Sequence, residues 1–170
     1  MIPTILETER LILRLITHED LDDLLQIWGD AETMHMFPKT LNRQEMREWI
    51  DRNLKRYQDF GYGLWAVILK NNQQFVGDCG LMVQEVDGVE ELEVGYHFNR
   101  KFWGQGLATE AARGCMDYAF TRLNHRRIIS MIRPENLSSR GVAERNGLKI
   151  EKELFWRGYQ HYVYAFELNS

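Results

Sequence analysis

The order of predicted elements along the chain indicates a single domain of mixed α and β structure. Stretches in which apolar and polar residues alternate, typical of strands, are interleaved with stretches in which apolar residues recur every three or four positions, typical of helices. The chain has 170 residues, enough to bury one proper core, and its hydrophobic content of 44% is ordinary for a globular protein. No repeat, linker or low-complexity tract divides it, so we expect residues 1–170 to form one domain.

The N-terminal third is expected to contain one strand and two helices. Residues 10–15 are rich in leucine and isoleucine and predict a strand. Thr17 follows as a helix N-cap with an acidic residue three places on, and Gly29 ends this first helix. A second helix is expected at residues 43–59, with an inward-facing stripe made of Met46, Trp49, Ile50, Leu54 and Tyr57.

The rest of the chain is expected to hold most of the sheet. Period-two alternation predicts strands at residues 64–69, 75–83, 90–99 and 127–132, and two last strands are expected at 148–156 and 159–168. Asn71-Asn72 and Asp87-Gly88 are turn signals between the first three of these strands. A helix at residues 109–122 presents a face of small residues, and a short helix at 138–146 ends at Gly147 as its C′ glycine.

Composition and charge argue against several classes of function. A net charge of −4 disfavours broad nucleic-acid binding, which needs a basic face. The five histidines and two cysteines show no metal-ligand spacing, so no metal is expected, and Cys79 and Cys115 are interpreted as buried thiols. No apolar run approaches the length of a membrane span and the start lacks a signal-peptide pattern, so we expect a cytoplasmic protein, as a monomer or a homodimer.

A glycine turn joins the strand at residues 90–99 to the helix that follows it. Gly104 and Gly106 let the backbone bend sharply, and the unpaired N–H groups of the helix start point back into the turn. Such a turn is a ready anion site, and an anion with two linked phosphates would fit it well, although on the glycines alone a plain bend is the simpler interpretation. The dinucleotide-binding fingerprint is excluded because Thr109 stands where a third small residue is needed.

The sequence around this turn resembles that of one enzyme superfamily. Glu93-Val94-Gly95-Tyr96, followed by Trp103-Gly104-Gln105-Gly106-Leu107-Ala108-Thr109-Glu110-Ala111, resembles the acetyl-CoA-binding core of the GNAT N-acetyltransferases. The superfamily motif is Gln or Arg, two residues, Gly, one residue, then Gly or Ala; Lys101 stands at its first position. Residues 8–14 and residues 134–148 resemble the RimJ/RimL-like, ribosomal-protein-type branch, so that the resemblance spans nearly the whole chain.

This resemblance implies a fold, a cofactor and a reaction. The fold is α+β: the GNAT acyl-CoA N-acyltransferase fold, a twisted and mostly antiparallel sheet, here of the seven predicted strands, with helices on both faces and a cleft between its fourth and fifth strands. The reaction moves the acetyl group of acetyl-CoA directly to a primary amine, which is a protein N-terminal α-amine or a small molecule. A non-catalytic acyl-CoA-binding regulatory module is the alternative from another class.

The resemblance also implies which residues hold coenzyme A. The pyrophosphate is expected on the backbone N–H groups of Gly104, Gln105, Gly106, Leu107, Ala108 and Thr109. The pantetheine arm is expected to pair with the backbone near Tyr96 and Phe98, and to meet Asn136 and Ser139. Lys101 and Arg145 are candidates for the 3′-phosphate, whereas Arg100 is interpreted as a surface charge.

Glu93 is the candidate general base. An amine with a pKa of ~10 is mostly protonated at neutral pH, so a carboxylate must accept its proton, directly or through water. His97 and Glu91 share the face of Glu93 by strand alternation and are the alternatives, and a structural pairing of Glu93 with an arginine is the competing interpretation. The tyrosine that commonly protonates the departing thiolate would fall at Ala143, so we expect Ser139, a water, Tyr162 or Tyr164 to replace it, or no acid to be needed.

The acceptor site is the least defined part of the sequence. Six aromatic residues could line it, several of them equally suited to the core: Trp28, Phe37, Trp65, Phe155, Trp156 and Tyr159. A group of acidic residues could attract a cationic amine or simply form a solvated helix face: Asp20, Asp22, Asp23, Asp30 and Glu32.

Overall fold

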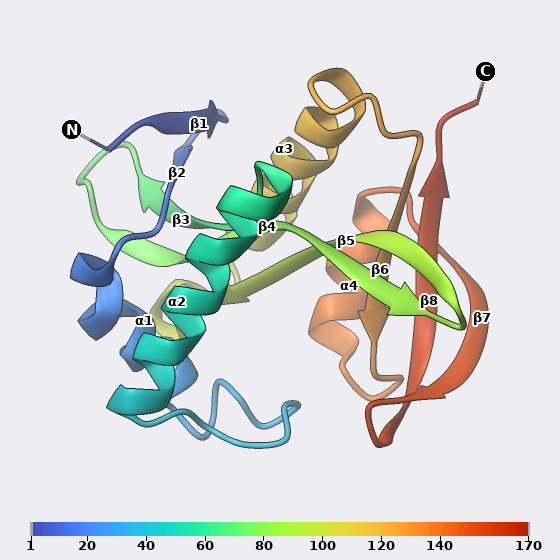
Figure 1. Ribbon diagram of the computed structural model, residues 1–170, viewed down its shortest axis with the longest axis horizontal. Helices are drawn as coiled ribbons and strands as arrows, with labels where there is room; N and C mark the ends of the chain where they lie inside the picture. Colours follow the sequence, from blue (N-terminus) through green and yellow to red (C-terminus); the bar gives the residue numbers. More distant parts are fainter. Residues whose placement is uncertain (1, 170) are drawn as a thin grey trace.

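The computed structural model describes residues 2–169 of the chain. These residues form one eight-stranded sheet and four α-helices (Figure 1). The strands lie in the order β1-β2-β3-β4-β5-β6-β8-β7 and comprise β1 Thr4–Glu7, β2 Leu11–Arg14, β3 Leu64–Leu69, β4 Phe75–Val86, β5 Val89–Phe98, β6 Arg127–Ile132, β7 Lys149–Trp156 and β8 Tyr159–Glu167. The helices are α1 Leu21–Trp28, α2 Arg43–Phe60, α3 Leu107–Thr121 and α4 Leu137–Arg145, with short 3-10 helices at His18–Asp20 and Arg100–Phe102.

Seven of these strands and all four α-helices lie where the sequence predicts them. The strand that was not predicted is β1, whose four residues are too few to show alternation and which pairs antiparallel with β2 through an irregular register. The helix after the glycine turn begins at Leu107, two residues earlier than expected, because the left-handed Gly106 serves as its N-cap. The capping box at Thr17 is present, with Asp20 as the residue that returns the bond, but it opens a 3-10 helix before α1.

The helices cover both faces of the sheet. Leu24 of α1 and Ile50 of α2 pack with Ile68 of β3 on one face, whereas Cys115 of α3 and Val142 of α4 pack with Ile128 of β6 on the other. In Figure 1 α2 accordingly crosses in front of the N-terminal strands and α3 lies behind them. Cys79 and Cys115 are fully buried thiols, as predicted. No helix within residues 2–169 is long and apolar enough to cross a membrane.

The sheet opens between β5 and β6. These two strands are the parallel pair of the sheet, and they are paired only at Glu93 and Ile129. Beyond that point, hydrogen bonds between side chains and backbone replace the backbone ladder. The Met131 N–H donates to Glu93 Oε2 at 2.7 Å, and Ser130 Oγ donates to the Val94 carbonyl at 3.2 Å. The strands therefore diverge, and Figure 1 shows β6, β7 and β8 leaning away from the N-terminal half.

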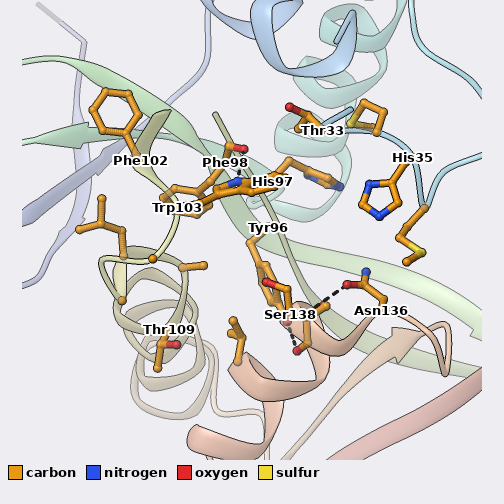
Figure 2. A pocket seen from close by; sticks show the side chains of 18 of the residues that line it. Thr33, His35, Tyr96, His97, Phe98, Phe102, Trp103, Thr109, Asn136 and Ser138 are labelled. Atoms are coloured by element: carbon orange, nitrogen blue, oxygen red, sulfur yellow. Dashed lines mark hydrogen bonds between the residues drawn. The ribbon is translucent and has the colours of Figure 1, made fainter. Parts of the chain in front are cut away.

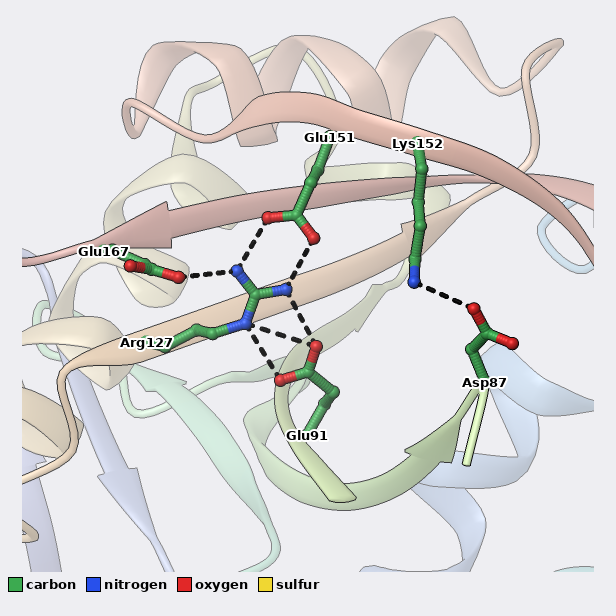
Figure 3. Close-up of polar contacts among 6 residues, drawn as sticks. All are labelled: Asp87, Glu91, Arg127, Glu151, Lys152 and Glu167. Atoms are coloured by element: carbon green, nitrogen blue, oxygen red, sulfur yellow. Dashed lines mark hydrogen bonds and ion pairs between the residues drawn. The ribbon is translucent and has the colours of Figure 1, made fainter. Parts of the chain in front are cut away.

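An ion-pair network closes the other end of this opening (Figure 3). Arg127, the first residue of β6, binds three carboxylates: Glu91 of β5 at 2.8 Å, Glu151 of β7 at 2.7 Å and Glu167 of β8 at 2.9 Å. These hydrogen bonds raise the pKa of the Arg127 guanidinium. One arginine thus joins four strands beside the Glu93–Ile129 pair, and Glu91 has a structural role there rather than a place near the reacting groups.

Candidate active site

A cavity of about 330 Å³ lies against the glycine turn, and we call it the turn cavity (Figure 2). It is lined by the loop at residues 33–37, by the end of β5 at residues 96–98, and by Phe102, Trp103, Gly104, Gly106, Leu107, Ala108, Thr109, Asn136, Ser138, Ser139, Val142 and Arg145. Figure 2 shows Tyr96 between the turn on one side and Asn136 on the other, with Thr33 and His35 of the loop across the opening. The cavity therefore extends from the start of α3, along the free end of β5, to α4.

The glycine turn presents a run of backbone donors. Gly104 and Gly106 both have φ of +77°, a conformation that residues with a Cβ rarely adopt. Among the described residues no hydrogen-bond acceptor is recorded for any backbone N–H from Gly104 to Thr109. Arg10 holds the turn in shape, because its Nη1 donates to the Gln105 carbonyl at 2.9 Å and its Nε pairs with Glu110 at 2.6 Å. These donors, at the positive end of α3, form a cradle for a doubly phosphorylated group.

The end of β5 offers a free strand edge to the same cavity. The Asn99 N–H donates to the Val76 carbonyl at 3.0 Å, so the backbone groups of Asn99, and by alternation those of His97, face β4. The backbone groups of Tyr96 and Phe98 consequently point toward the opening, where β6 has diverged. The Phe98 carbonyl already accepts a hydrogen bond from Trp103 Nε1 at 2.8 Å. An extended arm can thus add to β5 as an extra strand, which supports the prediction for Tyr96 and Phe98.

The start of α4 brings further polar groups to the cavity. Asn136 caps the helix, since its Oδ1 accepts the Ser139 N–H at 3.2 Å. The hydroxyl groups of Ser139 and Tyr96 lie 2.9 Å apart, and the Tyr96 hydroxyl is also 3.0 Å from the Ser139 carbonyl. Burial raises the pKa of the Tyr96 phenol, so it stays protonated and able to donate. Arg145 donates to Thr109 Oγ1 at 3.1 Å and lines the cavity beside the helix start.

Two residues of the predicted binding set do not line the turn cavity. Lys101 is exposed in the short helix Arg100–Phe102, and its side chain has no recorded partner among the described residues. Gln105 faces outward, with its carbonyl held by Arg10. Arg100 pairs with Asp30 at 2.7 Å and with Glu32, which agrees with its interpretation as a surface charge. Of the two candidates for the 3′-phosphate, Arg145 is therefore the one that the cavity includes.

A second cavity of about 340 Å³, the hairpin cavity, opens on the other face of β5, toward the β7–β8 hairpin. It includes Trp28, Trp49 and Arg56 of the first two helices, Glu93 and Gly95 of β5, Met131 and Arg133 after the divergence, and Trp156, Arg157, Tyr159 and His161 of the hairpin. Six residues belong to the walls of both cavities: Met36, Phe37, Tyr96, His97, Asn136 and Ser139. The two cavities therefore meet where β5 and β6 separate.

Glu93 lies in the hairpin cavity with only 7% of its surface exposed. Its Oε2 accepts the Met131 N–H at 2.7 Å and its Oε1 accepts the side-chain amide of Gln84 at 3.0 Å. Burial raises the pKa of this carboxyl above the usual value of 4.5, against the lowering effect of these hydrogen bonds and of Arg157. Glu93 forms no salt bridge among the described residues, so the interpretation as a structural ion pair is not supported.

His97 has a partner that was not predicted. Its Nδ1 lies 2.7 Å from Oδ1 of Asp78, a carboxylate with no exposed surface, and Trp28 Nε1 donates to the other oxygen at 3.0 Å. The Trp28 ring also lies 4.2 Å from the imidazole, centroid to centroid. Since an ionised carboxylate only accepts hydrogen bonds, Nδ1 is the donor in this contact, and the ring lies where the two cavities meet.

The family model of the acetyltransferase (GNAT) domain matches residues 10–149. The chain belongs to the GNAT acetyltransferase family. It is 35% identical over 159 residues to the uncharacterized N-acetyltransferase p20 of Bacillus licheniformis. This alignment covers 91% of this chain and 86% of that protein. A solved acetyltransferase from Agrobacterium tumefaciens aligns with a TM-score of 0.82 and 27% identity over 99% of this chain and 96% of that one. RimL, a ribosomal L7/L12 alpha-N-protein acetyltransferase solved with coenzyme A, shares the fold at a TM-score of 0.80 and 20% identity over 98% of both chains.

This GNAT protein is accordingly an N-acetyltransferase, and its acetyl donor is acetyl-CoA. The residues present fit that donor. The donor run from Gly104 to Thr109 matches a pyrophosphate in charge, and a Cβ at Gly104 would point into space with no atom within 4 Å, so the backbone itself forms the surface there. The free edge at Tyr96 and Phe98 continues from the turn toward Ser139.

Several other residues expected at the acetyltransferase site lie elsewhere. The Tyr164 hydroxyl donates to Glu144 at 2.6 Å and accepts from Arg140 at 3.0 Å, and neither Tyr162 nor Tyr164 lines either cavity. Ala143 is buried in the core, as a residue without a polar group can be. Tyr96 is the tyrosine that reaches the junction, and sequence reasoning missed its hydroxyl because only its backbone was considered.

The aromatic residues divide between the acceptor side and other places. Trp28, Phe37, Trp156 and Tyr159 line the hairpin cavity, whereas Trp65 is fully buried in the core and Phe155 is 70% exposed. None of the acidic residues suggested for attracting an amine lines that cavity. Asp20 pairs with Arg14, Asp22 with Arg43, and Asp30 and Glu32 with Arg100. Three residues of the site were not predicted from the sequence: Asp78, which contacts His97, and the arginines Arg56 and Arg157 of the cavity lining. An Asp inside an apolar strand is a signal that it needs a partner, whereas no local signal marks the two arginines.

Proposed function

We propose that this acetyltransferase holds acetyl-CoA in the turn cavity and transfers the acetyl group directly to an α-amine that enters the hairpin cavity. The observation that carries the proposal is the junction itself. The cavities approach β5 from opposite faces and share Tyr96, His97 and Ser139, so a donor and an acceptor can meet there without a covalent enzyme intermediate. Bringing the two reactants together in this way supplies much of the rate, by proximity and orientation.

Acetyl-CoA supplies the activated thioester, and the chain supplies its positioning. The backbone N–H groups of the glycine turn bind the pyrophosphate, and Arg145, which lines the same cavity, binds the 3′-phosphate. The outward backbone groups of Tyr96 and Phe98, with Asn136 and Ser139 opposite, orient the pantetheine arm. A backbone N–H near Tyr96 polarises the thioester carbonyl, the role that fixed donors have in oxyanion holes.

Glu93 acts as the general base for the acceptor amine. It is the only carboxylate among the described residues that line the hairpin cavity, and each of its oxygens has a second lone-pair direction besides the bond it already accepts. Its raised pKa makes it a stronger proton acceptor than an ordinary glutamate. His97 is the second candidate, favoured by its Asp78 partner and by its place on both walls.

Ser139 is proposed to protonate the departing thiolate, supported by the Tyr96 hydroxyl 2.9 Å away. The two groups form a short relay: Ser139 gives its proton to the thiolate sulfur, Tyr96 replaces that proton, and Tyr96 regains one from solvent once CoA has left. The demand on this relay is small, since a thiol with a pKa near ~8.5 is already a fair leaving group.

An α-amine is favoured over a lysine side chain for a physical reason. Its pKa of ~8 leaves a useful fraction unprotonated at neutral pH, whereas a lysine amine at ~10 has very little. The name of RimL describes an α-amine acetyltransferase with the same fold, which is consistent with this choice.

A competition assay tests the proposal. A short peptide with a free N-terminus is mixed with its N-blocked, lysine-containing counterpart, and both products are followed by mass spectrometry while released CoA is titrated with a thiol reagent. We expect acetylation of the free α-amine. Faster acetylation of the blocked peptide would reject the α-amine preference, and CoA binding without release for any amine would favour the non-catalytic alternative.

A further inference from the structure

The hairpin cavity is positively charged in a protein whose net charge is −4. Its described lining includes three arginines, Arg56, Arg133 and Arg157, and one carboxylate, Glu93. This reversal of sign is local, because Asp20, Asp22 and Asp30 near the first helix pair with other arginines and do not line the wall. The groups that neutralise the charge of these guanidinium groups indicate what kind of acceptor the cavity binds.

Arg133 is already satisfied. Its Nε pairs with Glu135 at 2.7 Å, its Nη1 donates to the Met36 carbonyl at 2.9 Å, and its guanidinium lies 4.1 Å from the centre of the Tyr159 ring. Its charge is therefore used to hold the wall of the cavity together. Among the described residues, neither of the other two arginines has an ion pair.

Arg56, on α2, is half-buried and has no hydrogen bond or ion pair recorded among residues 2–169. Burial lowers the pKa of its guanidinium, and the positive charges of Arg52 and Arg157 lower it further. A cation that is partly removed from water, with like charges around it and no anion beside it, is unfavourable unless a ligand completes the site.

Arg157 faces the same space from the β7–β8 hairpin. Arg157 and Gly158 have φ of 50° and 86°, as in a type I′ turn, and the guanidinium lies 4.2 Å from the centre of the Trp156 ring. Its Nη2 donates to Gln84 Oε1 at 3.0 Å, and the amide of the same Gln84 donates to Glu93 at 3.0 Å. One glutamine side chain thus separates this cation from the proposed base.

We propose that the acceptor is an amine that carries a carboxylate, with the carboxylate bound by Arg56 and Arg157 and the amine directed to Glu93. The inference rests on the proposed function and names its substrate class. A guanidinium binds a carboxylate through two parallel hydrogen bonds, which fixes orientation as well as charge. The same arginines repel a cationic acceptor, so a basic N-terminal segment is disfavoured. A cavity of about 340 Å³ suits one or two residues, from either a free amino acid or the acidic N-terminus of a peptide.

The first experiment compares isosteric acceptors. Dipeptide amides Ala-Glu and Ala-Gln share an α-amine of similar pKa and differ only in the charge of the second side chain. We expect kcat/KM to be about tenfold or more higher for Ala-Glu, as a charge-assisted hydrogen bond provides. Free glutamate and its diamide form a second pair, compared per unprotonated amine because the α-carboxylate raises the pKa of the amine. The faster acidic acceptor of the two sets, on the same basis, identifies the source. Equal rates within both pairs would overturn the proposal.

Matched variants assign the preference to the arginines. Arg56→Gln and Arg157→Gln should each reduce the ratio of acidic to neutral rates toward one, a readout that a general loss of structure would not change. Arg52→Gln is the control, because Arg52 lies one turn earlier on α2, is exposed and does not line the cavity. An unchanged ratio in both cavity variants would contradict the proposed contact.

A binding measurement separates this inference from the proposed function. N-acetylglutamate is titrated against the protein with CoA saturating, so that the phosphate sites are occupied, and the fluorescence of the cavity tryptophans is recorded. We expect saturable binding that weakens in Arg56→Gln, and no binding of the N-acetylglutamate diamide. Binding without turnover of any amine would reject the proposed function and retain the anion site. Turnover without acidic preference, and without this binding, would reject the anion site alone.

Discussion

The carboxylate of Glu93 accepts the backbone N–H of Met131 at 2.7 Å, at the position where β6 stops pairing with β5. A continuing parallel ladder would pair that N–H with a β5 carbonyl. The side chain proposed as the base therefore also helps to part the strands and create the space in which it acts. This double role makes the choice of substitution important, because a residue that cannot accept the bond would alter the cleft as well as the chemistry.

Glu93→Gln keeps an oxygen for the Met131 N–H but cannot accept a proton. We expect kcat/KM at neutral pH to fall by about 10²–10⁴-fold, the range of general base catalysis, and to recover partly at high pH where the amine deprotonates unaided. The wild-type profile should rise through a pKa above the ordinary glutamate value, since burial raises that of Glu93, and this limb should be missing in the variant. Steady-state kinetics from pH 5 to pH 10 measures both.

His97→Gln is the comparison for that experiment. If Glu93 is the base, the variant loses less activity and keeps the wild-type pH profile, although the thermal midpoint should drop because Asp78 is left buried with Trp28 as its remaining side-chain partner. A profile that is lost in His97→Gln and kept in Glu93→Gln would transfer the role of base to His97.

Gly104→Val should weaken CoA binding by at least about tenfold, since a side chain at this cradle would hold the phosphates away from the N–H groups. The added Cβ meets no protein atom within 4 Å, so the loss of folding stability comes mainly from the left-handed φ. Gly88→Val in the β4–β5 turn is the matched control, with φ of +79° and the same open surroundings. Calorimetry with CoA and thermal melting should show similar destabilisation in both variants and weaker binding only in Gly104→Val. Equal CoA affinity in the two would count against the turn as the phosphate site.

Tyr96→Phe and Ser139→Ala test the hydroxyl relay. Because the thiolate needs little help, each variant should lower kcat by less than about tenfold, and Tyr96→Phe should leave the KM for acetyl-CoA the same. The double variant should lose no more than the more affected single variant, since the two groups act in one chain. Additive losses would instead mean that the hydroxyls act separately.

Arg127→Gln should lower the thermal midpoint by a few degrees at neutral pH, because it leaves Glu91, Glu151 and Glu167 close together without their shared cation. The hydrogen bond from Arg127 lowers the pKa of Glu151, so this contribution is present above the unfolded-state pKa and is lost as the pH falls through the folded value. The difference between wild type and variant should therefore shrink between about pH 5 and pH 3. A difference that stays constant to pH 3 would show that packing, rather than charge, holds the network.

Local pattern predicted the elements well because each depends on neighbours in the sequence. The capping residue Thr17, the inward stripe of α2 and the paired glycines before α3 are all signals of short range. The strand β1 lacked such a signal, since its four residues are defined by pairing with β2.

The site was predictable only where backbone or motif defined it. The glycine turn follows from local sequence, whereas the outward edge at Tyr96 was expected from the resemblance to the family. The Asp78–His97 pair, the meeting of the Tyr96 and Ser139 hydroxyls, and the contact of Glu91 with Arg127 depend on strands and helices brought together from distant parts of the chain. Nothing in the sequence around Glu91 distinguished it from Glu93, because alternation places both on one face and only the pairing partner differs.

The position of β5 between two cavities has a consequence for how such an enzyme can diverge. The donor side is built from the turn, α3 and α4, whereas the arginines of the acceptor side come from α2 and the β7–β8 hairpin. With Arg56 and Arg157 binding the acceptor as proposed, substitutions there would change which amine is accepted without touching the residues that line the turn cavity. Gene duplicates could exchange acceptors by drift in these two surface segments alone, and a library randomised there is a rational starting point for redirecting the enzyme.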